Sequence, residues 1–293
     1  MRLTVGRSTS DIEEINSFAK WLLDLGEGNV GGPNDGEATI EIPQDLLIAD
    51  ASEPIASLID LVYPSILENV NNHNYFSERA ILAPKNDVVH EMNDRLLSMF
   101  QGEEREYLSS DSLCPTEDAN STQQRIYSSD VLNGLKISCL PNHRLVLKVG
   151  VPVMLLRNID QRNGLCNDTR LQVKKLYNRV IEVEIISGAN IGSCKCIPRI
   201  NLIPSNRKIS FAFQRRQFPL VVCFAMTINK SQGQPLSRVS LYLKQPVFSH
   251  GQLYVALSRV KTRDGVILLI LDNDRKHTDK TTNVVYKEIF NEL

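Results

Sequence analysis

Apolar residues recur at helical spacing in the first quarter of the chain, and this pattern predicts two helices. A Ser-x-x-Glu capping box at Ser10 marks the start of the first helix, and Gly26 marks its end. Its apolar face is expected to comprise Ile12, Ile15, Ala19 and Leu22. A second helix is predicted over 54–70, where Pro64 favours a kink. Its apolar face is expected to comprise Ile55, Leu58, Ile59, Val62 and Ile66.

A glycine-rich stretch, GEGNVGGPNDGEA, lies between these helices at residues 26–38. Its carboxylates would repel a phosphate, and a strand-like TIEI follows it. No helix N-terminus is therefore available there to bind an anion. The stretch is predicted to be a plain loop.

A buried strand followed by a helix is predicted next, which indicates one β-α unit of a parallel sheet. The strand is RAILAP at 79–84, and Asn86 is expected to cap the helix. The inward residues of that helix are expected to be Val89, Met92, Leu96 and Met99. Residues 101–130 hold 7 acidic and 2 basic residues, and they predict an irregular connection that is mobile in part.

The period of the apolar pattern changes to two between about 131 and 205, which predicts a small all-β unit inside an α/β chain. Its strands are expected at 151–157, 170–177, 180–186 and 194–200. Residues 210–227 are then expected to return to the first sheet. Two further buried strands are predicted at 238–243 and 265–271. Between them, the segment 249–261 predicts an amphipathic helix with Leu253, Ala256, Leu257 and Val260 inward.

The charge of the chain is segregated, although its net value is only −1. Residues 1–70 hold 3 basic and 13 acidic side chains, whereas residues 144–216 hold 14 basic and 4 acidic ones. A basic block of this size is typical of a surface that contacts a polyanion. The pattern also fits a β-ribbon whose basic faces are merely solvated.

Composition sets the broad class of the protein. The length of 293 residues suits about two domains, and 42% apolar with 23% charged residues is ordinary for a globular chain. The six cysteines are scattered, and Cys194-x-Cys196 is poor zinc spacing, so reduced thiols and no metal site are predicted. The longest apolar run, at 266–271, is too short to span a bilayer, and no signal peptide is apparent. We therefore expect an intracellular, reducing location and no membrane partner.

Two candidate sites for phosphate chemistry follow strand and helix ends. The stretch TINKSQG, residues 227–233, places Lys, Ser and Gly directly after an apolar strand, as phosphate-binding turns do. However, the chain contains no G-x-x-x-x-G-K-[ST] loop to hold a nucleotide. Arg259 lies six residues after Leu253 and points away from the apolar stripe. It could complement the helix dipole, or it could bind a phosphoryl group with its fork of donors.

A stretch of 47 residues that contains both candidate sites resembles a known family. FAMTINKSQGQPLSRVSLYLKQPVFSHGQLYVALSRVKTRDGVILLI, at 224–270, is similar to the last two motifs of the Pif-type (petite integration frequency) DNA helicases of superfamily 1B. The Asn in TINKSQGQ is closest to helicases of Helitron transposons. LKVGVPVMLLRNIDQRNGLCNDTRLQV and IPRINLIPS resemble the β-domain that this family inserts in its second motor domain. WLLDLGEGNVGGPNDGEATIEIPQDLLI and RAILAPKNDVVHEMNDRLL resemble the start of that domain.

The resemblance implies a RecA-like motor domain over 1–133 and 205–293, interrupted by a barrel-like all-β insert over 134–204. It implies only a C-terminal half, because the P-loop (Walker A), the acidic magnesium motif (Walker B) and the sensor glutamine of the first domain are absent. The opening Met-Arg-Leu resembles the end of a family motif just after that domain. A truncated gene, a gene-model fragment and a transposon remnant all fit this interpretation.

The resemblance also assigns roles to particular residues. In the family, ATP lies between two RecA-like domains, and arginines of the second domain reach its γ-phosphate. Arg259 and Arg2 match these arginines, and Gln232 and Gly233 lie toward the nucleotide. The residues that match the grip on single-stranded DNA are Thr227, Asn229, Lys230 and Ser231.

Three further features are weighed against this family pattern. Asp168 stands where the family usually has Gly, which indicates a turn with positive φ. Pro235 stands where Thr is usual and removes a backbone N–H just past the DNA-gripping turn. Arg215 and Arg216 alternate with aromatic residues and could contact DNA, with bases stacked on Phe211, Phe213 and Phe218. These phenylalanines also fit the core edge of a strand.

The function expected from the sequence is the C-terminal part of an ATP-dependent 5′-to-3′ DNA helicase. Its roles would be DNA repair, recombination or Helitron transposition, in the nucleus or alternatively in an organelle. ATP and Mg²⁺ would serve the complete enzyme, and this chain alone would hold neither and be inactive. Its partners would be single-stranded DNA and a first domain from a separate chain or an upstream exon. The alternatives are a non-catalytic remnant that binds single-stranded nucleic acid and an unrelated α/β protein with a solvated basic ribbon.

Overall fold

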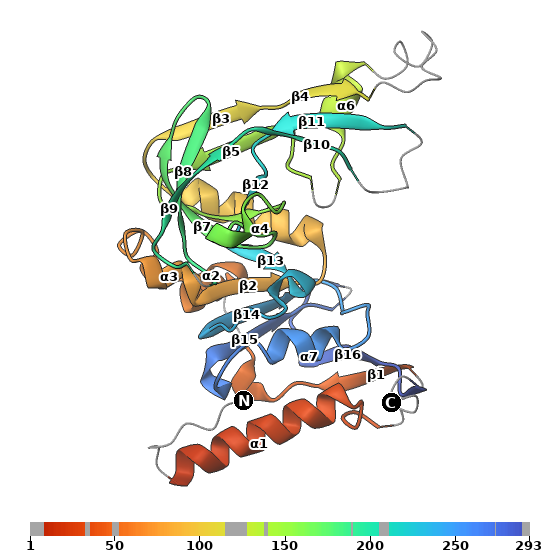
Figure 1. Cartoon of the computed structure of the whole chain (residues 1–293). Coiled ribbons are helices and arrows are strands. Elements are labelled where there is room, and N and C mark those ends of the chain that lie inside the picture. Colours follow the sequence, from red (N-terminus) through yellow and green to blue (C-terminus); the bar gives the residue numbers. More distant parts are fainter. Residues whose placement is uncertain are drawn as a thin grey trace. The chain divides into compact units, whose positions relative to one another are not determined.

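The computed structural model describes most of the chain, in eight segments: 9–32, 36–48, 53–114, 128–137, 140–188, 190–204, 211–272 and 274–288. The chain divides into two compact units, and each is described by itself. Unit 1 comprises residues 1–69, 74–92 and 224–293. Unit 2 comprises residues 70–73 and 93–223. Figure 1 shows their elements along the sequence.

Unit 1 is built on a four-stranded parallel sheet with the order β13-β2-β14-β15. Its strands are β13 (Ala225–Thr227), β2 (Arg79–Ala83), β14 (Arg238–Leu243) and β15 (Val266–Ile270). Most of their side chains are buried, as apolar runs in parallel sheets require. The three predicted buried strands are therefore confirmed, and their parallel pairing is the α/β arrangement that was expected.

The helices of unit 1 follow the predicted pattern with local shifts. α1 (Thr9–Gly26) ends at the predicted glycine, but its apolar face is centred on Phe18, Leu22 and Leu25, and Ile12 is exposed. α7 (Gln252–Leu257) is shorter than predicted and buries its apolar residues as expected. α4 (Asn86–Met99) begins in unit 1 and ends in unit 2, and Met99, which was expected inward, is 39% exposed at the last position of the helix.

The helix predicted over 54–70 is only half as long. α2 (Pro54–Val62) ends before Tyr63, which has φ −119° and ψ 58°. A residue before proline is disfavoured in the helical region, because the proline ring clashes with its backbone. Pro64 therefore stops this helix and does not kink it. A short α3 (His73–Ser77) follows.

Unit 1 also contains two short antiparallel strands and the 3-10 turns η1 and η4. β1 (Gly36–Glu41) pairs with β16 (Lys280–Val285), so the described part of the glycine-rich stretch is a loop that leads into a strand. η1 (Gln44–Leu46) and η4 (Arg263–Gly265) are joined by an ion pair of Asp45 with Arg263. The Arg263 guanidinium also lies 5.7 Å from the Phe18 ring and 5.9 Å from the Trp21 ring.

Unit 2 confirms the predicted all-β unit. Its largest sheet is antiparallel with the order β12-β6-β7-β8-β9. The strands are β12 (Leu220–Val222), β6 (Pro152–Leu155), β7 (Arg170–Leu176), β8 (Val180–Ile185) and β9 (Cys194–Pro198). A 3-10 turn, η2 (Gln161–Asn163), lies between β6 and β7.

Two strands of smaller sheets, β3 (Glu104–Leu108) and β4 (Ser110–Leu113), lie in the segment 101–130, which was expected to be irregular. β3 pairs with β5 (Arg144–Lys148), and β4 pairs with β11 (Phe213–Gln217), which also pairs with β10 (Ile200–Leu202). The expectation of an irregular 101–130 is thus wrong for its first part, and 115–127 lie outside the described residues. Cross-strand charge pairs such as Glu106 with Arg144 support β3, so the strand needs little apolar sequence.

Residues 210–227 do not return directly to the parallel sheet. β11 and β12 belong to the sheets of unit 2, and only β13 joins the parallel sheet. The side chains of β11 alternate between buried and exposed, which is the pattern of a half-buried antiparallel strand. With α6 (Ser129–Gly134), this region has its own small core of Leu132, Leu140, Leu202 and Phe213.

Unit 2 is wider than the insert expected over 134–204. It reaches from residue 93 to residue 223 and includes 70–73. The assignment of the two domains by name stays a prediction.

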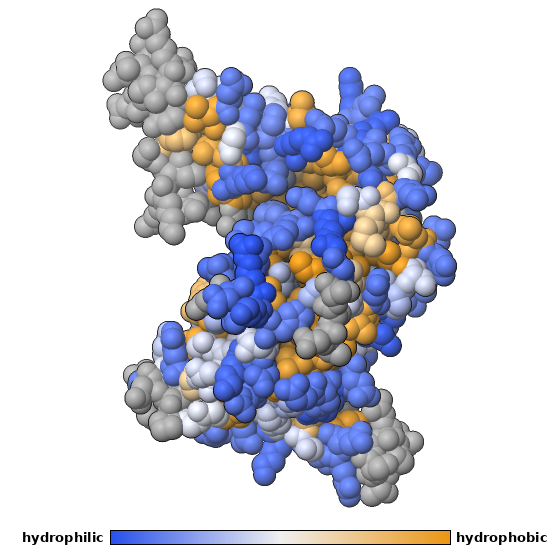
Figure 2. Space-filling view, turned by 180° about the vertical axis from the view of Figure 1, so that it is seen from behind, coloured by the Kyte–Doolittle hydropathy of each residue, from blue (hydrophilic) through white to orange (hydrophobic). Residues whose placement is uncertain are grey.

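Polar side chains cover most of the face shown in Figure 2, with hydrophobic residues in smaller patches. The most exposed large hydrophobic residues come from separate segments: Leu23, Ile191, Ile203 and Phe248. Within the described segments, no helix is both long and apolar enough to cross a membrane. The cysteines that the structure describes are free thiols.

Candidate nucleic-acid and nucleotide sites

The turn expected to grip DNA lies at the carboxyl end of β13. Residues Ile228–Ser231 form a 3-10 turn, η3, in which Asn229 is exposed and Lys230 is half-buried. Thr227 ends the strand and is also half-buried. Ser231 is fully buried, and its hydroxyl donates a hydrogen bond to the Ile228 carbonyl at 2.6 Å. Ser231 therefore shapes the turn from inside, whereas the Asn229 side chain is exposed.

Gly233 follows this turn in the left-handed region, with φ 78°. An added Cβ would meet no atom within 4 Å there, so space does not require a glycine. The backbone conformation does, because L-residues adopt this region only at a cost. Gln232 beside it is exposed. The expected nucleotide role of both residues stays a prediction.

Arg259 lies just past the end of α7, and its side chain is folded back along the helix. Its Nε donates to the Val255 carbonyl at 2.8 Å, and its Nη2 donates to the Ser258 hydroxyl at 2.9 Å. Partial burial lowers the pKa of the Arg259 guanidinium, and the nearby Tyr254 opposes this shift. The guanidinium stays charged at pH 7 because the pKa of arginine is far higher.

Hydrogen bonds connect both ends of α7 to the segment 229–236, which carries the DNA turn. Its first residue, Gln252, bonds to Asn229 at 3.3 Å. Past its last residue, the Arg259 carbonyl accepts the backbone N–H of Leu236 at 3.0 Å. At 1.5 Å rise per residue, the five steps from Gln252 to Leu257 correspond to about 7.5 Å of helix. The turn is thus bonded at the start of α7, and the arginine lies two residues past its end.

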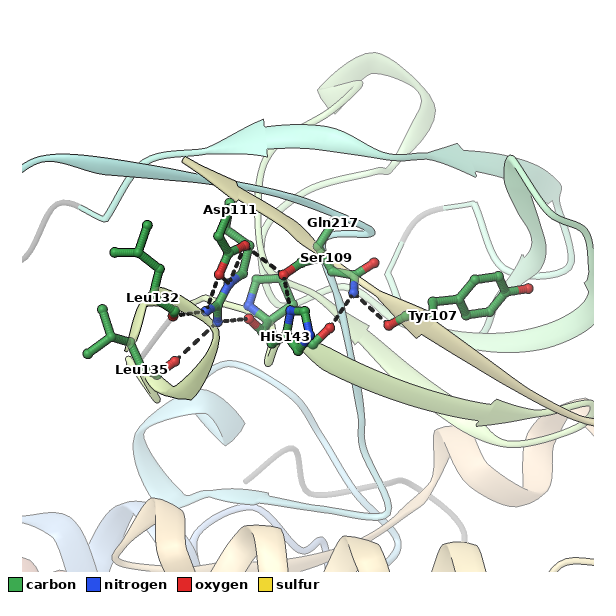
Figure 3. A network of polar contacts seen from close by, with 9 residues as sticks. Tyr107, Ser109, Asp111, Leu132, Leu135, His143 and Gln217 are labelled. Atoms are coloured by element: carbon green, nitrogen blue, oxygen red, sulfur yellow. Dashed lines mark hydrogen bonds and ion pairs between the residues drawn. The ribbon is translucent and has the colours of Figure 1, made fainter. Parts of the chain in front are cut away.

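Arg215 is placed where it cannot contact DNA, contrary to expectation. It is 0% exposed, and its guanidinium binds both carboxylate oxygens of Asp111, with the shortest contact at 2.7 Å (Figure 3). It also donates to backbone carbonyls of Leu132, Leu135 and Pro141. A buried charge needs such partners, since desolvation is costly. Arg215 is therefore a structural residue, and Arg216 beside it is exposed.

The same network fastens the junction of β3 and β4. The Ser109 hydroxyl lies 2.6 Å from Asp111 and 2.8 Å from Nδ1 of His143 (Figure 3). Gln217 donates to the carbonyls of Tyr107 and His143. These bonds connect three segments of unit 2, at residues 107–111, 143 and 217.

The basic block of 144–216 is less positive in space than in sequence. Acidic residues of β3, β4 and β8 form ion pairs with Arg144, Lys148, Lys174, Lys175 and Arg215. Arg162, Arg179 and Arg216 are exposed basic side chains of the block. The charge available to a polyanion is therefore carried by fewer residues than the count of 14 suggests.

Burial shows the place of two of the phenylalanines, and backbone geometry tests the turn at Asp168. Phe213 and Phe218 are fully buried, so they are core residues and cannot stack on bases in this structure. Asp168 has φ 63°, which confirms the predicted positive-φ turn. Arg2 lies outside the described residues. Among the residues that are described, no group of three or more His, Cys, Asp or Glu could hold a metal ion.

Sequence reasoning missed Gln252. It is 3% exposed and links α7 to the turn, but its polarity places it outside the apolar stripe that defined the helix. A buried glutamine at a helix start has no sequence signature of its own.

Comparison with known proteins identifies relatives of the chain. Residues 130–176 match the family model described as DNA helicase Pif1, 2B domain. The ATP-dependent DNA helicase PIF1 of Danio rerio is 30% identical over 214 residues, which cover 71% of this chain and 30% of the relative. That of Xenopus laevis is 29% identical over 203 residues, which cover 67% of this chain and 28% of the relative. The ATP-dependent DNA helicase RRM3 of Saccharomyces cerevisiae is 38% identical over 76 residues, which cover 26% of this chain and 10% of the relative.

Solved structures show the same fold. The crystal structure of Pif1 helicase from Candida albicans matches with a TM-score of 0.57 at 20% identity, over 100% of this chain and 60% of that one. That of Pif1 helicase from Bacteroides in complex with ADP-AlF3 and ssDNA matches with a TM-score of 0.53 at 18% identity, over 100% and 54%. The chain spans under a third of the two vertebrate relatives and somewhat over half of these solved chains. The expected resemblance to Pif-type helicases of superfamily 1B and the α/β, RecA-like fold are both confirmed.

Proposed function

We propose that this chain, a relative of the Pif-type helicases, forms the C-terminal motor part of an ATP-dependent 5′-to-3′ DNA helicase. The observation that carries the proposal is the path of α7, which binds the DNA turn at its first residue and reaches Arg259 just past its last. One rigid element thereby connects a phosphate grip for DNA to an arginine for a nucleotide.

On the DNA side, Thr227, Asn229 and Lys230 would bind the phosphates of single-stranded DNA. Asn229 is exposed and Lys230 half-buried at a strand end, and both carry N–H donors. Ser231 would contribute through its backbone, since its side chain is buried. Arg216, an exposed residue of unit 2, is proposed as a separate DNA contact. Contacts of this kind release counterions and read no sequence.

On the nucleotide side, Arg259 and Arg2 would stabilise the charge of the transferring γ-phosphoryl, and Gln232 and Gly233 would lie beside it. Arginines of this kind are worth about 10³–10⁵ in rate. Arg259 is now folded back on Val255 and Ser258, and would exchange these bonds for phosphate oxygens.

A first RecA-like domain, on a separate chain or an upstream exon, would hold ATP and Mg²⁺. No G-x-x-x-x-G-K-[ST] loop occurs in this sequence, and the described residues offer no carboxylate cluster for magnesium. We therefore expect no ATP hydrolysis from this chain alone. Opening and closing of the cleft between the domains would then advance the strand.

The second candidate is a non-catalytic remnant that binds single-stranded nucleic acid. The lack of a P-loop motif in the given sequence fits this candidate. The DNA turn fits both candidates equally. We propose a nuclear location for either version, with repair, recombination or Helitron transposition as the process. An in-frame P-loop upstream of Met1 in the genome would favour the helicase.

The test joins the chain to a competent first domain. The fused protein is expected to hydrolyse ATP when single-stranded DNA is added, and Arg259→Ala should lower turnover by about 10³-fold or more. Nucleotide affinity should change little if the arginine acts in the transition state. A fused protein whose DNA-stimulated turnover is unaffected by Arg259→Ala would refute the nucleotide role.

A further inference from the structure

We infer that Gln252 is a positioning residue that fixes the Asn229 side chain with its NH₂ group facing the DNA phosphate. This inference rests on the proposed function, because it explains how one residue of the proposed DNA grip is oriented. Gln252 lies outside the turn and determines which end of the Asn229 amide faces outward.

Hydrogen-bond chemistry determines which way both amides point. The side-chain oxygen of Gln252 accepts the backbone N–H of Phe248 at 3.1 Å. A backbone N–H can only donate, so the oxygen of Gln252 must face it and its NH₂ group must face the other way. That NH₂ donates to Oδ1 of Asn229 at 3.3 Å. The Oδ1 of Asn229 is thereby held inward, and its NH₂ is the end left to face outward.

The burial of Gln252 fixes the orientation of its amide group. Gln252 is only 3% exposed, whereas Asn229 is exposed. Rotating the Gln252 amide by 180° would set its NH₂ against the Phe248 N–H and leave buried donors without acceptors, which is costly. The exposed Asn229 amide has no such restraint of its own. Its orientation is therefore set by Gln252.

The orientation matters because a phosphate oxygen accepts hydrogen bonds and repels a carbonyl oxygen. With the NH₂ outward, Asn229 offers a hydrogen-bond donor to the phosphate. With the amide reversed, it would present a carbonyl oxygen to the same phosphate. Complete loss of this hydrogen bond to a charged group should weaken affinity about 10-fold or more.

Gln252→Met keeps the volume and removes both hydrogen bonds, so Asn229 can reverse freely. The affinity of the chain for fluorescein-labelled oligo(dT) is measured by anisotropy at one fixed salt concentration. With the two amide orientations about equally populated, Gln252→Met is expected to weaken binding about twofold when Asn229 is present, and to have no effect in the Asn229→Ala background. Gln252→Glu is expected to bind more weakly still, because its carboxylate would accept from the Asn229 NH₂ and turn the Oδ1 outward.

The matched control is Gln172→Met, which makes the same change at another buried glutamine. Gln172 donates to the carbonyls of Val70 and Gly150 in unit 2. It should lower stability and leave the DNA affinity unchanged. Unfolding in urea, measured in parallel for all variants, separates loss of fold from loss of binding.

The outcomes distinguish the two claims. Non-additive losses at Gln252 and Asn229, with Gln172→Met silent, support the inference. Equal losses from Gln252→Met in both backgrounds, or none in either, overturn the inference and leave the DNA grip standing. A wild-type chain that does not bind oligo(dT) overturns both.

Discussion

Asp111→Ala tests the claim that Arg215 is a structural residue. The substitution removes the carboxylate that pairs with the buried guanidinium and leaves the charge in place. Arg215 would keep three backbone carbonyl acceptors, at 2.8–3.2 Å, but no negative partner (Figure 3). Both side chains of the pair are fully buried, so water cannot replace the carboxylate without opening the fold.

The magnitude follows from this burial. Breaking a buried ion pair on one side costs about 3–5 kcal/mol, against a total of about 5–15 kcal/mol for a typical domain. Replacing both partners with apolar residues of similar size is often nearly neutral. We therefore expect Asp111→Ala and Arg215→Met each to lower the free energy of unfolding by about 3 kcal/mol or more. Asp111→Leu combined with Arg215→Met should recover most of it.

The assay is urea unfolding at pH 7, followed by far-UV circular dichroism for the whole chain. The fluorescence of Trp21, the one tryptophan, reports unit 1 separately, whereas Asp111 and Arg215 belong to unit 2. A loss below about 1 kcal/mol in both single variants would refute the burial argument. So would a stable double variant that loses DNA affinity while Arg216→Ala binds normally, because Arg215 would then contact DNA.

Three further predictions concern unit 1 and the nucleotide side. Asp45→Asn should lower stability by about 0.2–1 kcal/mol at pH 7, since this pair is exposed. The hydrogen bond from Arg263 lowers the pKa of the Asp45 carboxyl in the folded chain, so its contribution is present above the unfolded value near 4 and is lost as the pH falls through the folded one. Urea unfolding at steps between pH 7 and 3 checks this, and a difference that grows at low pH would contradict it. Gly233→Ala should cost about 1–2 kcal/mol through the backbone alone, whereas an unchanged unfolding midpoint would show that the turn adopts another conformation. The pure chain should show no DNA-stimulated phosphate release from ATP, and release that Arg259→Ala abolishes would contradict this.

The parallel sheet of unit 1 could be predicted because its information is local. Residues 80–83 and 266–271 are apolar without interruption, as in a strand that is buried on both faces. The positive φ of Asp168 was predicted from the glycine that usually stands there in the family that the chain resembles.

Features that depend on distant partners could not be predicted. The carboxylate of Asp111 neutralises Arg215 across 104 positions, and neither residue signals the other in the sequence. β3 is polar because its support comes from charge pairs with β5, so its pattern resembled a loop. Gln252 was missed because its burial arises from the turn that packs on α7.

The most direct test of the central claim compares Lys230→Ala with Arg259→Ala in the isolated chain. Affinity for single-stranded DNA is measured over a series of salt concentrations, with unfolding measured on the same samples. Wild-type log K should fall with log salt at about 0.7 per phosphate neutralised. Lys230→Ala should weaken binding and reduce that slope by up to ~1, whereas Arg259→Ala should leave both unchanged, since its partner is a nucleotide. Equal loss of DNA binding in the two variants, or an affinity that does not respond to salt, would contradict the account.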